Sequence, residues 1–464
     1  MKTPNPLWAT AELVSAIADY YEFSMAMANM EEGIAGKQSV FDLVLRNVPS
    51  GRSFMVNAGL EQAAAYLLTG KGNSALKQYL EEVQGVSDRE FLSWSEDFSF
   101  KGDLYAMPEG TIFFGQEPQL RVHERFEEAQ VFESLLLNTV NPQTNVATTA
   151  NDIASVTNKI LLEGGSRRAT SPQSALFNSR AARIGGFTAS SNVAFGMEYG
   201  EKVGGTHGHS YIMLHPTEYA AFKAQEKTLG KEVCFLLDTY DVGNALETVL
   251  KIVEEDHLSH FALRIDSGDL LEQALMIHQR LKARGVERSR YTLIASDDLT
   301  ADKITNLERG GADLDKYLVG TYVVNPAKPL GGVYKLAAFL ETNGNWELRG
   351  KISENPRKAT LPGIKQVYRV TSPDGYYRHD VIALEGEDLS RYIPCNSDRV
   401  EELLIPIIKD GVQVYDFPTL NEISARRKKQ LSLFREIKGY ETIVSERIKE
   451  EQEEIRQRYG QRAA

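Results

Sequence analysis

The chain has 464 residues, of which 42% are hydrophobic and 25% are charged, a composition typical of a soluble globular protein. Its net charge of −12 argues against nonspecific binding to nucleic acid or to an anionic membrane surface. The sequence has no signal peptide, no run of about 18 apolar residues, and no CxxC metal motif around its two cysteines, Cys234 and Cys395. We therefore expect a cytoplasmic protein with neither a disulfide framework nor a metal site made by the protein alone.

The first 130 residues predict a mixed α+β unit. Apolar positions near a 3.6-residue period predict a helix over residues 9–32. Further helices are expected over 59–69 and, as two polar segments, over 75–97. The expected strands are 39–46, 54–56, 110–114 and 119–122.

From residue 127, helices and short apolar strands alternate. Two helices are expected over 132–141 and 144–163. The expected strands that follow are 211–214, 234–237, 261–265, 291–295 and 317–320, and helices are expected between them over 216–228, 241–254, 268–284 and 299–309. This spacing predicts parallel strands with crossovers, and hence an α/β barrel. Each strand is followed by polar residues, namely His215, Asp238, Asp266, Ser296-Asp297-Asp298 and Thr321. Active sites of α/β barrels lie at the carboxyl ends of the strands, so we expect the active site at these polar residues.

The remainder of the chain returns to a β pattern after Gly331, with strands expected over 333–339, 346–349, 367–370 and 381–384. Residues 422–462 predict a solvated helix, since their dense charges are of mixed sign and do not form a basic tail. We therefore divide the chain into an N-terminal α+β domain (1–130), an α/β barrel with active-site loops (131–335) and a C-terminal part (336–464). The C-terminal part, a β segment with helices, is expected to pack with the N-terminal domain.

Residues 204–216, the loop and the first expected barrel strand with its end, contain three of the eight histidines, His207, His209 and His215. Small residues surround the first two, so the backbone can approach a ligand closely. Imidazole changes charge near neutral pH and can act as a nucleophile, which makes this loop a candidate for catalysis. A single histidine in a turn is also common as a structural residue.

Short motifs run in order through nearly the whole chain, and together they resemble the nicotinate phosphoribosyltransferase family. They are Asp19 to Met25, Phe41 to Leu43, Ala58 to Glu61, Ser166 to Ala169, Ile184 to Phe187 with Ser191-Asn192, Gly205 to Ser210, Leu237 to Tyr240, Arg264 to Leu270, Val319 to Thr321, Gly331 to Leu336, and Lys351 to Glu354 with Thr360 to Gly363. One of these motifs alone would be weak, but their shared order and spacing are specific.

The resemblance implies a type II phosphoribosyltransferase fold, an irregular α/β barrel with an α+β domain built from both chain ends. It implies a homodimer with shared active sites, and transfer of phosphoribose from 5-phosphoribosyl 1-diphosphate to nicotinate. The product would be nicotinate mononucleotide, on a salvage route to NAD, with coupled hydrolysis of ATP. By the same resemblance, ATP would phosphorylate His209, and Asp238 would pair with His209 and orient it.

The resemblance also implies which residues contact the substrates. Tyr21 would reach the pyridine pocket from the partner subunit, Thr206 and Arg264 would contact substrate, Asp266 would face the ribose, and Gly320 with Thr321 would hold the 5′-phosphate. We also expect Ser296, at a strand end, to line the substrate site.

The chemistry of these residues agrees with the implied reaction. Arg167, Arg168 and Arg264 supply local positive charge for phosphates despite the acidic chain. Departure of diphosphate builds positive charge at the anomeric carbon, which a carboxylate such as Asp266 can stabilise. Mg²⁺ would be held mainly by substrate phosphates with one or two carboxylates.

Two positions differ from the family pattern. Gly164 stands where the family usually has an aromatic residue that stacks on the pyridine ring, and His207 replaces a commonly apolar neighbour, so that two histidines compete for the nucleophile role. We favour His209, because Ser210 completes the family pattern. For the base we favour nicotinate, because Ser190 and Ser191 can donate hydrogen bonds to its carboxylate, whereas nicotinamide-using relatives carry an Asp in this loop.

Three other interpretations remain open. The same fold could act on another base such as nicotinamide, or the protein could bind a phosphoribosyl ligand without turnover. An aldolase-like barrel would require a Schiff-base lysine at a strand end, and the sequence offers no convincing one.

Overall fold

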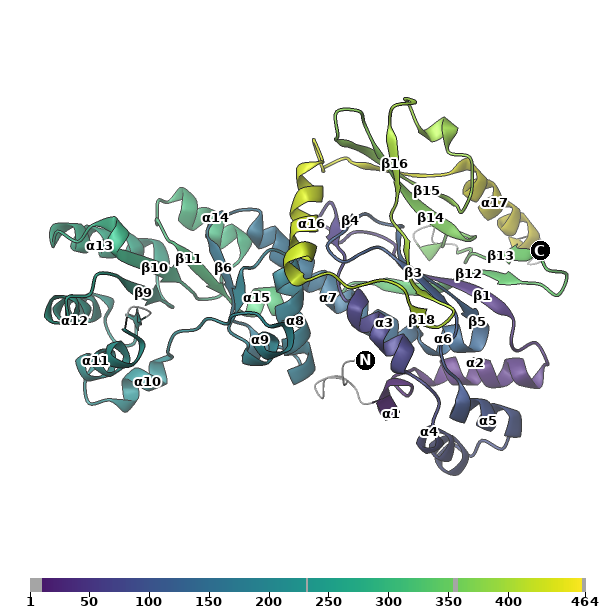
Figure 1. Ribbon diagram of the computed structural model, residues 1–464, viewed down its shortest axis with the longest axis horizontal. Coiled ribbons are helices and arrows are strands. Elements are labelled where there is room, and N and C mark those ends of the chain that lie inside the picture. Colours follow the sequence, from purple (N-terminus) through teal and green to yellow (C-terminus); the bar gives the residue numbers. More distant parts are fainter. Residues whose placement is uncertain (1–10, 231–232, 354–357, 461–464) are drawn as a thin grey trace. The chain divides into compact units, whose positions relative to one another are not determined.

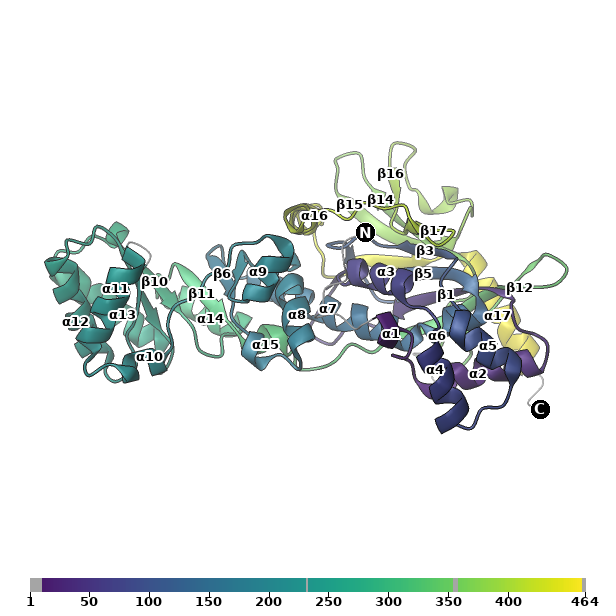
Figure 2. The same cartoon turned by 60° about the horizontal axis from the view of Figure 1, so that its bottom comes forward.

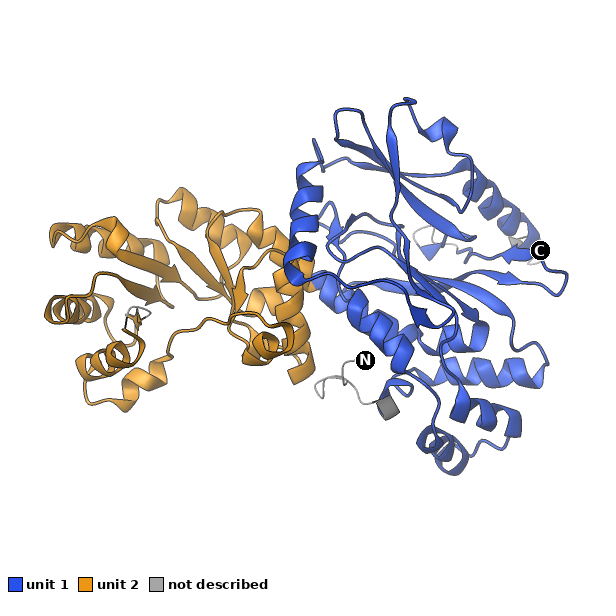
Figure 3. Cartoon of the chain, in the orientation of Figure 1, with its two compact units in different colours: residues 1–145, 328–464 blue, residues 146–327 orange. Residues whose placement is uncertain are grey.

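A computed structural model describes residues 11–230, 233–353 and 358–460. The chain forms two compact units, one of residues 1–145 with 328–464 and one of residues 146–327, drawn in blue and orange in Figure 3. The first unit is thus built from both ends of the chain. Glu354 of one sequence motif, and the ends of the first and last predicted helices, lie outside the described residues.

The second unit is an α/β structure whose six strands are all parallel (Figures 1 and 2). Their order is β7-β6-β11-β10-β9-β8. The bounds are β6 Ile160–Glu163, β7 Ala189–Ser190, β8 Cys234–Leu236, β9 Phe261–Ile265, β10 Tyr291–Ala295 and β11 Lys316–Val319. The helices are α8 Pro172–Ile184, α9 Val193–Tyr199, α10 His209–Leu214, α11 Glu218–Leu229, α12 Val242–Glu255, α13 Leu270–Ala283, α14 Ala301–Arg309 and α15 Thr321–Val324, with η2 Ser166–Arg168 and η4 Arg288–Arg290 as single 3₁₀ turns.

Local sequence explains why each crossover helix begins where it does. The side chains of Asp241, Asp269 and Thr300 accept hydrogen bonds from backbone amides in the first turns of α12, α13 and α14. These N-caps satisfy amides that have no partner inside the helix. The strands and the turns after them therefore end at fixed positions, which places the polar residues at the carboxyl edge of the sheet.

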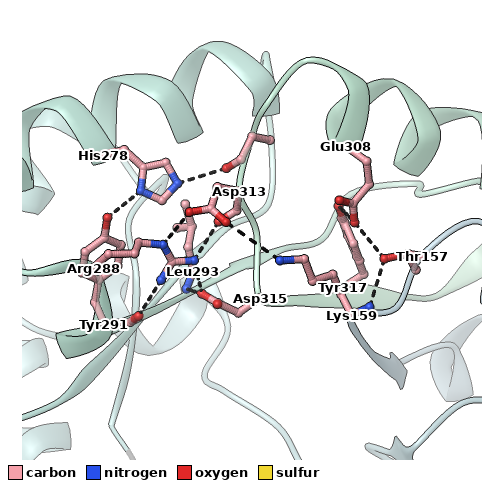
Figure 4. A network of polar contacts seen from close by, with 11 residues as sticks. Thr157, Lys159, His278, Arg288, Tyr291, Leu293, Glu308, Asp313, Asp315 and Tyr317 are labelled. Atoms are coloured by element: carbon pink, nitrogen blue, oxygen red, sulfur yellow. Dashed lines mark hydrogen bonds and ion pairs between the residues drawn. The ribbon is translucent and has the colours of Figure 1, made fainter.

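The opposite, amino-terminal edge of this sheet is stabilised by a polar network (Figure 4). Arg288 bonds Asp313 at 2.7 Å and Asp315 at 2.8 Å, and Asp315 also accepts from the amide of Leu293 at 2.7 Å. His278 lies between the hydroxyl of Tyr291, at 2.5 Å, and the carbonyl of Ala312, at 3.0 Å. These contacts fix the loops that lead into β10 and β11, and hence the strands that carry the site at their other ends.

The first unit contains a seven-stranded sheet in the order β13-β12-β1-β5-β3-β17-β18, a four-stranded sheet in the order β16-β14-β15-β19, and the pair β2-β4. The strands are β1 Gln38–Leu45, β2 Met55–Val56, β3 Asp103–Ala106, β4 Ile112–Phe113, β5 Pro118–Arg125, β12 Gly332–Leu340, β13 Trp346–Leu348, β14 Lys365–Thr371, β15 Tyr377–Leu384, β16 Arg399–Glu402, β17 Ile405–Lys409, β18 Val412–Gln413 and β19 Glu441–Val444. The helices are α1 Ala11–Val14, α2 Tyr20–Glu31, α3 Leu60–Thr69, α4 Ser74–Gln78, the π-helix η1 Tyr79–Val83, α5 Arg89–Asp97, α6 Phe126–Val131, α16 Leu420–Ser432 and α17 Glu446–Gly460, with the 3₁₀ turn η6 Ser390–Tyr392.

A buried ion pair lies inside the four-stranded sheet of this unit. Arg369 on β14 donates from Nε and Nη2 to the two carboxylate oxygens of Asp380 on β15, at 2.9 and 2.6 Å, and both side chains are 0% exposed. The carbonyl of Ile112 accepts a further bond from Arg369 Nη2 at 2.8 Å. Removing one partner of such a pair is strongly destabilising, because the other charge is then buried without compensation.

The structure corrects five predicted elements. Residues 211–214 are not a strand but most of helix α10, in which Ile212 is buried while Met213 and Leu214 are 65% and 81% exposed. A run of four apolar residues does not distinguish a buried strand from a helix with one buried residue. The two helices predicted over 132–163 are one helix, α7 Glu133–Ala154, which continues through Pro142 and is followed by β6.

The two terminal helices also differ from the prediction. The helix predicted over 9–32 is interrupted between α1 and α2, and the one predicted over 422–462 is two helices separated by β19. Among the described residues, no helix has the length and apolar character needed to cross a membrane.

Candidate active site

Arg264 is the centre of a polar cluster at the carboxyl edge of the parallel sheet in residues 146–327. It lies near the end of β9, is 9% exposed, and pairs in register with Leu236 of β8 and Ile294 of β10. Its Nε donates to Ser296 Oγ at 2.8 Å, and its Nη1 donates to Thr206 Oγ1 at 2.8 Å and to the carbonyl of His207 at 3.3 Å. Its Nη2 lies 2.9 Å from Asp266 Oδ1. One side chain therefore joins two strand ends to the histidine loop.

Asp266 is ionised more readily than an ordinary aspartate. Burial alone would raise the pKa of Asp266, but a hydrogen bond with Ser296 and the charge and hydrogen bond of Arg264 hold it below its usual range. Its second oxygen, Oδ2, lies 3.6 Å from His209 Nε2. The cluster thus presents a fixed negative charge beside an imidazole.

His209 and His207 differ clearly in their surroundings. His209 begins helix α10, its side chain is 39% exposed, and its Nδ1 lies 3.2 Å from Thr239 Oγ1. His207 packs against the rings of Tyr211 and Phe222, and neither of its ring nitrogens has a hydrogen-bond partner in the residues that the structure describes. Burial, aided by the charges of Arg264 and His209, lowers the pKa of His207 to about 4. His207 is therefore neutral and enclosed at neutral pH, whereas His209 is accessible.

Asp238 lies close to this cluster but has a different partner from the one expected. Within the described part of the chain, the side-chain contacts of His209 are with Thr239 and Asp266, and Asp238 accepts a hydrogen bond from Ser267 instead. The second carboxylate oxygen of Asp238, Oδ1, is buried without a hydrogen-bond partner in the same residues. The expected pairing with His209 is therefore absent from this arrangement.

The turn after β6 and the loop after β7 bring further expected residues to the same edge. Arg167 and Arg168 are exposed on the 3₁₀ turn η2, and no partner for either guanidinium occurs in the described ranges. Ser191 is exposed, and its amide donates to the carbonyl of Glu163 at 2.8 Å. Ser190 is only 1% exposed, and its hydroxyl donates to Glu163 Oε2 at 2.6 Å. Ser190 therefore cannot offer a free hydroxyl to a ligand, contrary to the expectation from sequence.

Gly320 and Thr321 follow β11 and begin helix α15. They lie against the turn after β6, since a Cβ added at Gly320 would be 3.4 Å from the carbonyl oxygen of Gly164. A Cβ at Gly165 would be 2.5 Å from a methyl carbon of Val324 in the same helix. The close packing of these two turns depends on glycine, and it places Arg167 and Thr321 on neighbouring turns.

Tyr21 belongs to the other unit, where it is 45% exposed on helix α2. Burial and the nearby carboxylate of Glu133 raise its pKa. In the same unit, several of the sequence motifs meet around a cavity of about 350 Å³ lined by Asp42, Arg46, Lys335, Ser353, Thr360 and Lys365 among others. Some of the motifs therefore lie at the strand ends around Arg264, and others line this basic cavity.

Comparison with known proteins decides the family. Profiles described as the nicotinate phosphoribosyltransferase N-terminal and C-terminal domains match residues 17–141 and 364–438. A protein of Bacillus subtilis named nicotinate phosphoribosyltransferase is 35% identical over 445 residues, covering 90% of this chain and 89% of that protein. The chain belongs to the nicotinate phosphoribosyltransferase family.

Solved structures show the same fold. The crystal structure of human nicotinic acid phosphoribosyltransferase aligns with a TM-score of 0.78 and 26% identity, covering 93% of this chain and 98% of that one. A nicotinate-nucleotide pyrophosphorylase from Pyrococcus furiosus aligns with a TM-score of 0.72 at 24% identity, covering 94% and 99%. The type II phosphoribosyltransferase fold expected from sequence is therefore confirmed, with an α/β unit and an α+β unit made of both chain ends.

Sequence reasoning missed some residues that shape the site. Thr239 and Ser267 are the hydrogen-bond partners of His209 and Asp238, and both lie in motifs whose charged members drew attention first. Asp297 and Asp298, which the sequence places with Ser296 at the end of the same strand, follow β10 with positive φ angles of 96° and 34°. The residue types indicate the polar strand end, but they do not reveal this strained backbone, which often marks a functional site.

Proposed function

We propose that the protein is a nicotinate phosphoribosyltransferase, which forms nicotinate mononucleotide and diphosphate from nicotinate and 5-phosphoribosyl 1-diphosphate with coupled ATP hydrolysis, in cytoplasmic salvage of pyridine nucleotides for NAD. The cluster of Arg264, Asp266 and His209 at the strand ends supports this most directly. It combines a fixed anion, a cation and an accessible imidazole in one place. The curated relatives carry the same activity in their names.

Asp266 is suited to the transfer step. As the bond from the anomeric carbon to diphosphate breaks, positive charge develops on the ribose ring, and nicotinate attacks the same carbon through its ring nitrogen. A carboxylate held ionised by Arg264 stabilises that charge without reorganising, which is how preorganised electrostatics lower a barrier. Thr206, Arg264 and Ser296 would then orient the ribose around Asp266.

His209 is our candidate for the phosphate acceptor. Its Nδ1 is occupied by Thr239, so Nε2 is the nitrogen directed toward Asp266. A nucleophile held by a neighbouring group on one nitrogen and open on the other fits the usual arrangement for covalent catalysis. Asp238, one residue before Thr239, would act indirectly by fixing that segment through Ser267. The enclosed position of His207 argues against the same role for it.

Phosphates and base would be held by the neighbouring turns. Gly320 and Thr321 would hold the 5′-phosphate with backbone and hydroxyl donors. Arg167 and Arg168, whose guanidinium groups have no partner among the described residues, would meet anionic groups. Ser191 would donate to the carboxylate of nicotinate. The neutral hydroxyl in this position favours nicotinate over nicotinamide, which remains the rival base.

Mg²⁺ fits this site only as an ion shared with substrate. No cluster of three or more His, Cys, Asp or Glu side chains suited to a metal occurs in the described residues. The unpartnered Oδ1 of Asp238 is a carboxylate oxygen that could hold Mg²⁺ together with substrate phosphates. The ion would neutralise phosphate charge as diphosphate leaves.

A homodimer would complete the site. Tyr21 is exposed, and in the part of the chain where burial is described so are Val193, Met197, Met213 and Leu214, apolar side chains near the loops of the site. Exposed apolar residues of this kind support an interface between copies. In such a dimer, Tyr21 of the partner subunit would reach the pyridine ring.

One assay tests the proposed function. Purified protein is incubated with 5-phosphoribosyl 1-diphosphate and Mg²⁺ and with nicotinate or nicotinamide, each with and without ATP, and the mononucleotide product is measured. We expect nicotinate mononucleotide, formed faster with ATP. Equal or better use of nicotinamide would overturn the choice of base, and binding without product from either base would favour a phosphoribosyl-ligand binding protein.

A further inference from the structure

Glu163, the last residue of β6, is a buried carboxylate that the proposed chemistry does not use. Its side chain is 0% exposed. The strand β6 is labelled beside its neighbour β11 in Figure 1. One oxygen accepts a hydrogen bond from the backbone amide of Gly165. The other accepts from the hydroxyls of Ser179, on α8, at 2.8 Å and of Ser190, on β7, at 2.6 Å. Three donors from three segments therefore converge on one side chain.

The backbone of Glu163 joins the same two loops. Glu163 pairs with Ser190 in the parallel ladder between β6 and β7, and its carbonyl accepts from the amide of Ser191 at 2.8 Å. Its side chain fixes the turn that begins at Gly164, and its carbonyl fixes the loop that contains Ser191. Arg167 and Ser191, both proposed to contact substrate, are thus held by a single residue.

Asn192 completes a closed hydrogen-bond network around the carboxylate. Its backbone amide donates to Ser190 Oγ at 3.0 Å, and its Nδ2 donates to Ser179 Oγ at 3.2 Å. Its Oδ1 accepts from the amide of Ala194 at 3.1 Å and so caps helix α9. The loop of residues 189–192 can therefore move only if bonds to Glu163 break.

We propose that Glu163 is a positioning residue for base recognition, because it sets the turn of residues 164–168 and the loop of residues 189–192 relative to each other. This inference rests on the proposed function. A carboxylate only accepts hydrogen bonds, so it suits three converging donors. Glutamine has the same shape but presents an NH₂ group to at least one of them. The prediction is therefore that Glu163→Gln keeps the fold and loosens the loops.

The test compares Glu163→Gln with two single-hydroxyl variants of the same loop. Ser190→Ala removes a hydroxyl that bonds Glu163, whereas Thr188→Val removes one that bonds the carbonyl of Leu161 at 2.9 Å instead. For each variant, kcat/KM is measured with nicotinate and with nicotinamide. Backbone amide exchange is followed in segments 164–168 and 189–192, with segment 261–267 as internal reference.

We expect Glu163→Gln and Ser190→Ala to lower the ratio of kcat/KM for nicotinate to that for nicotinamide by about tenfold, the size of one lost hydrogen bond to a charged group. Thr188→Val should leave the ratio unchanged. Amide exchange should speed up in both segments of the first two variants, while segment 261–267 stays as in the unmodified protein. A purely structural role would lower both activities by one common factor and leave the ratio intact, and that result would overturn the proposal.

The exchange measurement separates this proposal from the proposed function. If the unmodified protein forms no nucleotide from either base, the proposed function fails, and exchange alone shows whether Glu163 holds the two segments. If exchange in both segments is unchanged in Glu163→Gln and in Ser190→Ala, Glu163 does not position them, whatever the activity.

Discussion

Asp266 Oδ1 lies 2.9 Å from Arg264 Nη2, and a hydrogen bond with Ser296 together with this ion pair holds the pKa of Asp266 below its usual range although the carboxyl is half-buried. Without the cation, the hydrogen bond with Ser296 is the main influence that still opposes burial, so the pKa of Asp266 should rise. Because transfer requires ionised Asp266, we expect Arg264→Gln to move the acidic limb of the pH profile of kcat upward by about one pH unit or more. Profiles from pH 4 to 8 with saturating substrates measure the shift.

The control for this shift is Arg284→Gln, which removes the same charge from a surface pair with Glu247 in the same unit. Its acidic limb should stay where it is in the unmodified protein. An Arg264→Gln profile that only falls in height, with an unmoved limb, would show that Arg264 does not govern the ionisation of Asp266.

His209→Ala should abolish the stimulation of transfer by ATP and leave a slow transfer that depends on substrate positioning. The reason is that His209 is accessible and held through one nitrogen, whereas His207 is enclosed. Initial rates with and without ATP, together with detection of acid-labile phosphate on the protein, measure this. The matched variant His207→Ala should retain stimulation, and the reverse pattern would assign the role to His207.

His207 should make the protein sensitive to acid. Its pKa is lowered to about 4, against 6.5 for an ordinary histidine, so the unfolded chain takes up a proton before the folded one does. The stability that comes from keeping His207 neutral is present above pH 6.5 and is lost as the pH falls toward 4. We expect His207→Leu to lose less unfolding free energy between pH 7 and pH 5 than the unmodified protein, as measured by urea denaturation. Equal losses would mean that His207 does not titrate in this window.

Ser191→Asp should erode the preference for nicotinate by about tenfold or more, because a carboxylate near the base repels the carboxylate of nicotinate and can accept from the amide of nicotinamide. The ratio of kcat/KM on the two bases is the measurement. Ser191→Asn, which is similar in size and uncharged, is the control and should change the ratio much less. A ratio unaffected by Asp would place the base away from Ser191.

Asp380→Ala should destabilise the unit of residues 1–145 and 328–464 by about 3–5 kcal/mol, because it leaves the fully buried guanidinium of Arg369 without its counter-ion. The double variant Arg369→Met with Asp380→Leu should cost less than the single one, since it removes both charges. Urea unfolding of both variants tests this. A larger loss of unfolding free energy in the double variant would indicate that the ion pair itself stabilises the unit.

The sequence predicted the strands of the α/β unit well where an apolar run ended in a polar residue. Residues 261–265 and 291–295 are β9 and β10 with the same bounds, because both segments are mainly apolar, with only Arg264 and Thr292 as exceptions, and are followed by Asp266 and Ser296. The same reasoning failed for residues 211–214, where only Ile212 is buried and the run became helix α10. Whether such a run forms a strand or a helix depends on which of its residues are buried. A run of four apolar residues does not show this.

The partners within the site were harder to foresee than its members. His209 and Thr239 are thirty residues apart, and their 3.2 Å contact depends on how the loop after Gly204 meets the end of β8. Ser190 and Ser191 have the same side chain, yet the hydroxyl of Ser190 donates to Glu163 whereas Ser191 is exposed. Such differences arise from the direction in which a side chain leaves its strand, which alternates at every residue.

Arg264 also bears on the thermodynamics of ligand binding. All three of its guanidinium nitrogens are engaged before any substrate arrives, so the rotamer freedom of a long side chain is lost during folding and not during binding. A ligand that uses Arg264 must exchange one partner for another. Thr206, on a loop with three glycines among residues 204–208, is the partner most easily exchanged, because that loop has the least bulk to hold it. Calorimetry should therefore show more favourable binding enthalpy for ligands that displace only Thr206 than for ligands that must also break the hydrogen bond to Ser296.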